Sequence, residues 1–409
     1  MRMVTKEMKK EEFSSISGNI KKIAGIDPVL TVSVVLLNLM GLVSIRSITE
    51  ITGSNGILVK QAAGSVIGVV VMIAVCLVDT QKITKYWKIY YAVTVISLLA
   101  VLIFGSSGGG ARRWISVAGL TFQPSELAKI LLILFYSEYI IEMRGKFARP
   151  LVYVFSTLLI LPPFFMILKE PDLSTGIMVF LIFCVILFVA GIDRKIVAGV
   201  TAAAIPAAFI IIYLSVIGDM PFLGDYQRQR ILAWLHPEDY ASSTAYQTMN
   251  SMTAIGSGRL IGKGLHVDES STLLGTGFIS ESQTDFIFAV IGEQLGFIGC
   301  CIMIFLITAV AVRCYMIASK SGAIRDRIIA AGMASWIGFQ SYINIGVATG
   351  LLPNTGIPLP FVSYGLTSLL CLYFGLGLVQ SIYLKNDLKA SSEHTLTEGE
   401  TNEDCTDCT

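Results

Sequence analysis

Acidic side chains stand at the edges of apolar runs in this sequence, where they can do chemistry or cap a helix. Asp285 precedes a long apolar run within ESQTDFIFAVIGEQ, residues 281–294, and Asp172 lies in KEPDLSTG. Glu126 and Lys129 are three residues apart, so they share one face of a helix. A carboxylate near cations is a candidate general base, whereas a carboxylate at the start of a helix is also an N-cap.

Basic side chains occupy glycine-rich stretches that are candidates for binding an anion. Arg112 and Arg113 precede Trp114 in GSSGGGARRWISVAGL, and Arg259 and Lys263 lie in AIGSGRLIGKGL. Guanidinium groups bind phosphate through paired hydrogen bonds, so a phosphate or anionic head group is the predicted ligand. The alternative for the first stretch is ordinary anchoring at a membrane interface. The second stretch lacks the spacing of a nucleotide-binding P-loop.

Composition indicates the elements that must position these residues. The chain has 409 residues, 54% hydrophobic and 14% charged, whereas a soluble domain is about a quarter charged. Apolar runs of roughly 17–25 residues predict membrane-spanning helices. Three histidines are too few and scattered for a histidine metal site, and a net charge of +1 gives no indication of nucleic acid. We predict an all-α polytopic membrane protein with ten spans, at about residues 28–46, 57–78, 87–105, 122–141, 150–168, 173–191, 195–217, 285–312, 328–352 and 361–384.

The distribution of positive charge predicts the orientation of the spans. Most of the 30 lysines and arginines fall on the side of the N-terminus, which favours a cytoplasmic location for both termini. We therefore expect a cytoplasmic segment at 1–27, a membrane domain at 28–385 with a large outer loop at 218–284, and a disordered acidic cytoplasmic tail at 386–409. No cysteine falls in an outer loop, so a disulfide framework is not expected. The tail's Cys405 and Cys408 form an isolated C-x-x-C pair.

Four outer segments carry most of the Gly, Pro and charged residues, which predicts one shared site on that face. They span residues 105–129, 169–176, 218–284 (with Arg230) and 351–365. Irregular backbone at membrane depth survives only where it is buried in protein or lines a wet cavity. The last segment, LLPNTGIPLPFVSYG, therefore predicts a broken or re-entrant turn packed in protein, in which Ser363 either contacts substrate or serves helix packing.

The helical phase of residues 281–294 predicts which way Asp285 faces. Small residues at 289, 292, 296 and 299 fall within roughly 40° of Asp285 on a helix. Such a face allows close packing of helices, so Asp285 is expected to face protein rather than lipid. Glu293 is a candidate buried partner. An N-cap role for Asp285 contributes about 1 kcal/mol, and a general base is the alternative.

These same segments resemble the motifs of the SEDS (shape, elongation, division and sporulation) family, in that family's order, over about residues 25–385. The resemblance implies polymerisation of peptidoglycan glycan strands from lipid II on the outer face of the bacterial plasma membrane. It also implies a class B penicillin-binding protein as partner, with other elongation or division proteins. The segments that carry the resemblance are GGARRWISVAGLTFQPSELAKI, EPDLSTG, AIGSGRLIGKGL, TDFIFAVIGEQLGFIG and NIGVATGLLPNTGIPLPFVSYG.

The resemblance extends to individual residues. Asp285 matches the family's essential aspartate, Asp172 matches another motif aspartate, and Trp114, Glu126 and Lys129 match functionally important positions. There are departures as well. The family usually has other residues at Ser174, Gln283 and Leu366, which leaves the subfamily open.

The implied reaction is glycosyl transfer with a lipid pyrophosphate as the leaving group. We assign Asp285 as the base for the acceptor hydroxyl; alternatively it coordinates a divalent cation, Mg²⁺ or Mn²⁺. No other cofactor is expected. The candidates for holding the pyrophosphate or fixing the loops are Arg112, Arg113, Arg230 and Lys129. Two other classes of protein stay open. A lipid flippase would carry ionisable residues through the midplane and internal repeats, and a non-catalytic scaffold would carry cytoplasmic docking domains.

Overall fold

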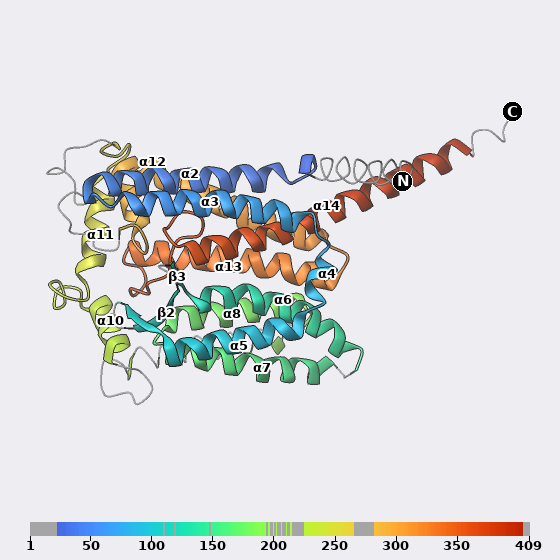
Figure 1. Ribbon diagram of the computed structural model, residues 1–409, viewed down its shortest axis with the longest axis horizontal. Helices are drawn as coiled ribbons and strands as arrows, with labels where there is room; N and C mark the ends of the chain where they lie inside the picture. Colours follow the sequence, from blue (N-terminus) through green and yellow to red (C-terminus); the bar gives the residue numbers. More distant parts are fainter. Residues whose placement is uncertain are drawn as a thin grey trace, which may run out of the picture.

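The computed structural model describes residues 23–108, 111–117, 120–146, 149–193, 225–265 and 282–403, with scattered positions between 195 and 214. In this part of the chain, long helices lie side by side along the long axis of the molecule (Figure 1). The predicted cytoplasmic segment up to residue 22 and most of the predicted seventh span lie outside the described residues.

Each predicted span other than the seventh overlaps a helix. Among the described residues, six helices are by length and composition apolar enough to cross a membrane, namely α2, α3, α5, α7, α12 and α14, and α8 is apolar but shorter. The protein is therefore mostly helical and polytopic, while the count of ten spans stays a prediction. The helices are α2 (Pro28–Thr52), α3 (Asn55–Cys76), α4 (Thr80–Thr84), α5 (Trp87–Phe104), α6 (Pro124–Arg144), α7 (Arg149–Lys169), α8 (Leu173–Val189), α10 (Asp225–Leu235), α11 (Tyr246–Ser257), α12 (Ile287–Lys320), α13 (Ile324–Ala348) and α14 (Leu366–Glu403).

Local sequence signals explain where several helices begin. Asp27 caps α2 by accepting a hydrogen bond from the Leu30 amide, and Pro28 occupies the first turn, where its missing N–H costs nothing. Pro124 does the same for α6, whose first turn also holds Glu126. Asp172 caps α8. Short polar residues and prolines therefore mark these boundaries.

A small antiparallel sheet corrects the all-α prediction. Strands β1 (Ser106–Gly108), β2 (Ala111–Val117) and β3 (Leu120–Phe122) lie in the order β1-β2-β3. Trp114 pairs with Ser106, and Ile115 pairs with Phe122. Aromatic and β-branched residues in the second strand favour a pleated surface, so three paired strands form where we expected irregular loop.

The long loop predicted at 218–284 is partly helical. Its described residues, 225–265 and 282–284, contain α10 and α11, and α11 packs against α12. These two helices lie at the same end of the bundle as the sheet (Figure 1). The described part of this loop is thus a packed cap on one end of the helices.

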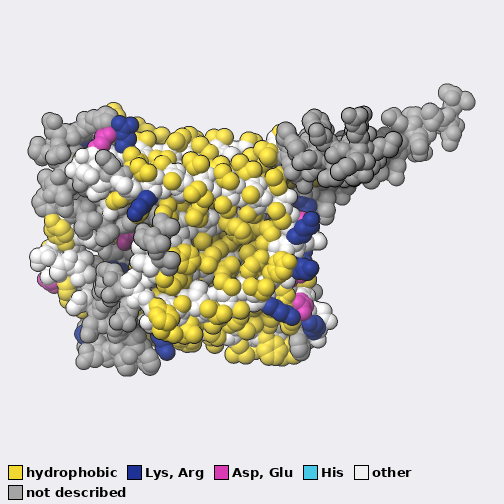
Figure 2. All heavy atoms as spheres, in the orientation of Figure 1, with side chains coloured by type: hydrophobic (Ala, Val, Ile, Leu, Met, Phe, Trp, Pro, Cys, Tyr) yellow, Lys and Arg dark blue, Asp and Glu magenta, His cyan; other side chains and the backbone are white. Residues whose placement is uncertain are grey.

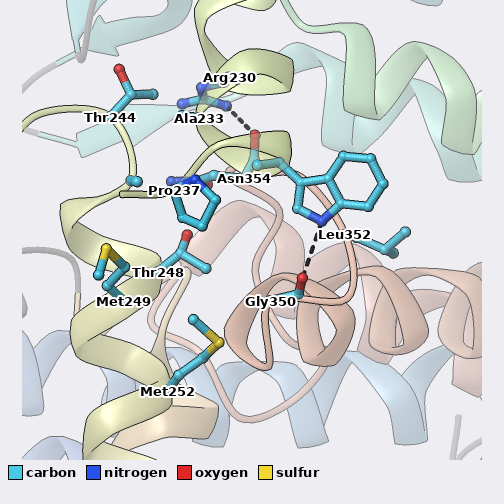
Figure 3. A pocket seen from close by; sticks show the side chains of 12 residues that line it. Arg230, Ala233, Pro237, Thr244, Thr248, Met249, Met252, Gly350, Leu352 and Asn354 are labelled. Carbon is cyan, nitrogen blue, oxygen red and sulfur yellow. Dashed lines mark hydrogen bonds between the residues drawn. The ribbon is translucent and has the colours of Figure 1, made fainter. Parts of the chain in front are cut away.

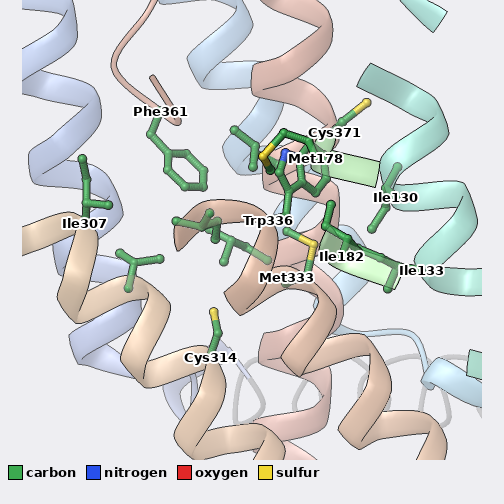
Figure 4. Packing of buried hydrophobic residues seen from close by; sticks show 14 of the residues in the cluster. Ile130, Ile133, Met178, Ile182, Ile307, Cys314, Met333, Trp336, Phe361 and Cys371 are labelled. Atoms are coloured by element: carbon green, nitrogen blue, oxygen red, sulfur yellow. The ribbon is translucent and has the colours of Figure 1, made fainter. Parts of the chain in front are cut away.

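Packing of the long helices creates one core. Helix α12 contacts α13 and α2, α3 contacts α14, and α13 contacts both α6 and α8. Fully buried Trp336 of α13 lies near Met333, Ile130 and Ile133 (Figure 4). Outside this core, a broad hydrophobic band covers the sides of the helices, with basic residues at its two ends (Figure 2). That distribution is what a bilayer requires of a spanning protein.

The start of α2 and the end of α14 lie at the end of the bundle opposite the sheet (Figure 1). Asp27 is fully buried there, and its carboxylate pairs with Arg313 at 2.6 Å. The backbone amide of Asp27 donates a hydrogen bond to Gln380 Oε1. Helix α14 continues to Glu403, past residue 385 where we expected a disordered tail to begin. No proline stands between residues 386 and 403 to stop it. Which end is cytoplasmic stays a prediction.

Candidate active site

Three side chains from distant parts of the chain converge on Gly356. A Cβ placed on this glycine would lie 3.3 Å from Asp285 Oδ2, 3.8 Å from Arg113 Nη1 and 4.0 Å from Arg230 Nη1. Gly356 has φ +70°, a conformation that only glycine adopts at little cost. A carboxylate and two guanidinium groups therefore share one small volume beside bare backbone, and we call these four residues the Gly356 cluster.

The segment between α13 and α14, residues 349–365, is irregular, with residues 357 and 359–363 buried and the others, apart from exposed Leu351, half-buried, as expected for a turn packed in protein. Two side chains from α10 hold it. Arg230 Nη1 donates to the carbonyl of Asn354 at 3.0 Å, and Trp234 Nε1 donates to the carbonyl of Gly350 at 3.0 Å (Figure 3). The same figure shows a pocket between these residues and α11, lined also by Thr248. The outer loop thus fixes the backbone that carries Gly356.

Asp285 is not the N-cap of α12. Phe286 occupies that position and the helix begins at Ile287, with no side-chain capping hydrogen bond. Instead, Asn344 Nδ2 donates to the carbonyls of Asp285 at 2.8 Å and Ile357 at 2.7 Å. The backbone of Asp285 is therefore tied, through Asn344, to the segment that carries Gly356.

Ser363 supports the same placement. Its hydroxyl donates to the carbonyl of Thr284 at 2.6 Å and accepts from the amide of Leu359 at 2.7 Å, and the amide of Tyr364 donates to the carbonyl of Gln283. Ser363 is nearly fully buried. Between the two alternatives for Ser363, its contacts are those of a residue that packs the turn against the segment preceding Asp285.

Arg113 joins the cluster to the start of α8. Its Nη2 donates to the carbonyl of Pro171, and its Nε lies 3.9 Å from Asp172 Oδ2. The other carboxylate oxygen of Asp172 accepts from the amide of Thr175 at 3.1 Å. Asp172 therefore serves both as the cap of α8 and as the partner of Arg113. Ser174 Oγ, two residues beyond Asp172, donates to the carbonyl of Thr355 at 3.0 Å.

Glu126 and Lys129 lie in the core rather than at the cluster. Lys129 Nζ donates to Glu126 Oε1 at 2.6 Å and to Gln340 Oε1 at 2.7 Å, and it lies 4.8 Å from the ring centre of Trp336. Both charged side chains are almost fully buried. Gln340 Nε2 in turn donates to the carbonyl of Pro358. The pair thus contacts the turn through Gln340, and both charged side chains stay buried.

Arg259 and Lys263 lie beside an interruption of helix α12. The helix has non-helical torsions at Gly296, where amides that follow the break donate to carbonyls of the outer loop, as Phe297 does to Arg259 at 2.9 Å. Lys263 Nζ pairs with the carboxylate of Glu293 at 2.7 Å. Glu293 is buried, as the helical phase predicts, and lies two turns along α12 from Asp285. The Arg259 side chain is exposed.

The remaining predicted residues lie on β2. Trp114 is half-buried, and its carbonyl accepts from Ser106 Oγ. The backbone of Arg112 belongs to the strand, while its side chain lies outside the described residues. The sequence interpretation missed Asn344, Gly356 and Glu170. Asn344 could have been found as a lone asparagine in an apolar helix. Gly356 and Glu170 could not, because only their proximity in space to the cluster marks them.

Buried polar atoms without a hydrogen-bond partner gather around the cluster. In the part of the chain that the structure describes, they include Arg113 Nε, Asn344 Oδ1, Asn354 Oδ1, Thr355 Oγ1 and both carboxyl oxygens of Glu170. Buried polar groups are normally satisfied, so these atoms indicate a place for a polar ligand. Among the described residues, no group of three or more His, Cys, Asp or Glu side chains is placed to hold a metal ion, and a divalent cation at Asp285 stays a prediction.

Comparison with known proteins gives consistent matches over nearly the whole chain. The family model for FtsW, RodA and SpoVE, described as a cell cycle protein, matches residues 28–387. The chain is 34% identical over 340 residues to peptidoglycan glycosyltransferase MrdB of Escherichia coli, covering 82% of this chain and 88% of MrdB. It is 30% identical over 379 residues to a probable peptidoglycan glycosyltransferase FtsW of Geobacter metallireducens, covering 89% and 96%.

Solved structures match as well. A chain from a peptidoglycan synthase complex, described as coordinating polymerization and crosslinking, aligns with a TM-score of 0.72 at 27% identity, covering 88% of this chain and 98% of that chain. The rod shape determining protein RodA of Thermus thermophilus aligns with a TM-score of 0.63 at 26% identity, covering 88% and 97%. The fold is therefore shared over almost the full length of both structures.

Proposed function

This chain belongs to the FtsW, RodA and SpoVE family, and from that premise we propose that it is a peptidoglycan glycosyltransferase that polymerises lipid II. The observation that carries the proposal is the convergence of Asp285, Arg113 and Arg230 on Gly356. The relatives named above are themselves called peptidoglycan glycosyltransferases. Relatives of both the MrdB and FtsW names match at similar identity, so the function extends to cell elongation or division without a choice between them.

The cluster has the groups that the reaction requires. A sugar hydroxyl attacks the anomeric carbon of the donor, the bond from that carbon to the pyrophosphate oxygen breaks, and the hydroxyl proton must go to a base. Asp285 is that base, because it is the carboxylate in the cluster. Arg113 and Arg230 bind the departing pyrophosphate, whose negative charge grows as the bond breaks. A single displacement inverts the configuration of an α-linked donor to give a β-linked glycan.

The other predicted site residues take supporting roles. Glu126 and Lys129 hold the turn beneath the cluster, and Ser363 fixes the segment before Asp285. Lys263, through its pair with Glu293, and the backbone carbonyl of Arg259 hold the outer loop on α12. Arg112 and Trp114 contribute from the same strand as Arg113. Asp172 orients Arg113 through their 3.9 Å contact.

The membrane gives the site its surroundings. We propose that the protein lies in the bacterial plasma membrane with both termini in the cytoplasm, so that the sheet, α10 and α11 face outward. This orientation follows from the excess of positive charge at the opposite side. The likeness to a chain of a complex that couples polymerization with crosslinking supports a class B penicillin-binding protein as partner.

Polymerisation of purified lipid II tests the proposal against its alternatives. We expect the protein, reconstituted with its transpeptidase partner, to lengthen glycan strands, and Asp285→Asn to make none. A flippase would move a fluorescent lipid II analogue across vesicles without lengthening glycan. A scaffold would do neither, yet would still bind the partner. If Asp285→Asn polymerised lipid II normally at equal protein level, the assignment of Asp285 as the general base would be wrong.

A further inference from the structure

Glu170 is a buried acid that the mechanism above does not use. It follows the last residue of α7, and its amide donates to the carbonyls of Met166 and Ile167, which extends the final helical turn. The side chain is fully buried. Neither carboxyl oxygen has a hydrogen-bond partner among the described residues. An ionised carboxylate in such a place would lose its hydration without compensation.

The charged groups that face Glu170 belong to the candidate site. They are Asp172, two residues further along, and Arg113 from β2, while neighbouring Lys169 is exposed. Burial is the largest influence and raises the pKa of Glu170; repulsion from Asp172 raises it further, and Arg113 lowers it. The resulting pKa is about 8, so the carboxyl group holds its proton at neutral pH.

We propose that Glu170 is a positioning residue which, in its protonated form, leaves Arg113 shared between Asp172 and the anionic donor, and which switches polymerisation off when it ionises. This inference rests on the proposed glycosyltransferase function. It deepens that function by adding a second carboxyl group, one that touches neither sugar nor pyrophosphate, and by setting the alkaline limit of the same site.

The geometry of Arg113 explains the effect. Its guanidinium group contacts both the start of α8 and the turn that carries Gly356. Nη2 donates to the Pro171 carbonyl and Nε lies near Asp172, while Nη1 lies near Gly356. While Glu170 is neutral, Asp172 is the charged partner of Arg113 at the start of α8. When Glu170 releases its proton to solvent, a third carboxylate stands beside Arg113. The new charge draws Arg113 toward the turn before α8 and repels the pyrophosphate.

The direction of the pH dependence follows from the raised pKa. The neutral form prevails below about pH 8, so activity is retained there and falls as pH rises through that value. Glu170→Gln keeps the size and neutrality of the protonated acid but cannot ionise. Glu50→Gln is the matched control, because Glu50 is exposed and pairs with Arg46 on α2, away from Arg113.

Two measurements on the full-length protein test the proposal. The first is lipid II polymerisation at pH 7 and pH 9, in which we expect wild type and Glu50→Gln to lose roughly tenfold more activity than Glu170→Gln. The second is infrared difference spectroscopy without substrate. We expect a carbonyl band of a neutral carboxyl group in wild type at pH 7 that titrates near pH 8 and is missing in Glu170→Gln.

The two readouts separate the failure of this inference from that of the proposed function. The infrared band does not require polymerisation, so its presence in a protein without polymerase activity would contradict the function alone. An identical alkaline decline in wild type and Glu170→Gln, or a missing band, would overturn the role of Glu170. Glu170→Met offers a second neutral replacement. If neither neutral variant folds, the site requires a charged Glu170 and the proposal is wrong.

Discussion

Two clusters of this protein pair a carboxylate with a cation, yet their surroundings differ. In the core, Lys129 contacts Glu126, Gln340 and the ring of Trp336, and both charges are almost fully buried. At the Gly356 cluster, Asp285, Arg113 and Arg230 surround a glycine. Buried polar atoms without hydrogen-bond partners gather around the second cluster, whereas in the first such an atom is Glu126 Oε2.

The same residue types, a carboxylate and a cation, can therefore either stabilise the fold or take part in a reaction, depending on their surroundings. The core pair is bonded within the helices, since Lys129 donates to both Glu126 and Gln340, and it fixes the turn through Gln340. Around the Gly356 cluster, buried polar atoms such as Asn354 Oδ1 and Thr355 Oγ1 have no hydrogen-bond partner among the described residues, which a stable fold would otherwise avoid. Substitutions at the cluster should therefore change activity more than stability, and substitutions in the core pair should do the reverse.

Asp285→Ala gives the largest expected loss of activity. Removal of a general base slows the chemical step about 10²- to 10⁴-fold. Because Asp285 is not the cap of α12, the thermal unfolding midpoint should change little. Rates of lipid II polymerisation and unfolding in detergent measure the two effects. A large drop in the midpoint with a matching loss of folded protein would make Asp285 a structural residue like Lys129.

Lys129→Met gives the largest expected loss of stability. It leaves the buried Glu126 carboxylate unpaired, which costs about 3–5 kcal/mol. The double variant Glu126→Leu with Lys129→Met removes both charges and should recover most of that loss. Thermal unfolding and the yield of monodisperse protein measure both. A double variant that is folded but as inactive as Asp285→Ala would show that the core pair also takes part in the chemistry.

Gly356→Ala tests how closely the cluster is packed. Both Gly356 and Gly53 have positive φ, +70° and +68°, but a Cβ on Gly53 meets nothing within 4 Å. Each alanine variant should lose about 1–2 kcal/mol of stability from backbone strain. Only Gly356→Ala should lose activity, by about tenfold, because its methyl group displaces Asp285. Equal activity in the two variants would argue against the cluster as the reaction site.

Ser363→Ala gives the smallest expected effect. It leaves the Thr284 carbonyl and the Leu359 amide without their partner, at a cost of about 1–3 kcal/mol. Activity should fall several-fold through misplacement of Asp285. Ser341→Ala is the control, because that buried hydroxyl bonds only the carbonyl of Ile337 in its own helix. Activity reduced as far as in Asp285→Ala would instead favour direct contact of Ser363 with substrate.

Several features could be read from the sequence because they depend on local physics. The apolar runs, the prolines that open α2 and α6 and the cap at Asp172 all act within one turn of helix. The sheet was missed because its strands are short and lie between glycines. The break of α12 at Gly296 was also missed, because it depends on the outer loop supplying carbonyls to the interrupted helix.

The amino-acid sequence alone indicates a mostly helical, polytopic membrane protein and its family motifs, because the length of apolar runs and the order of residues carry that information. It does not settle the direction of Asp285 by helical phase, since α12 begins only at Ile287. Only the tertiary structure decided which charges meet. Arg113, Arg230, Asp285 and Gly356 lie far apart along the chain, and the packing of β2, α10, α12 and the turn before α14 brings them together. Packing likewise placed Glu126 and Lys129 in the core and buried Glu170 beside Arg113. Spacing along one helix cannot report contacts that the other helices supply.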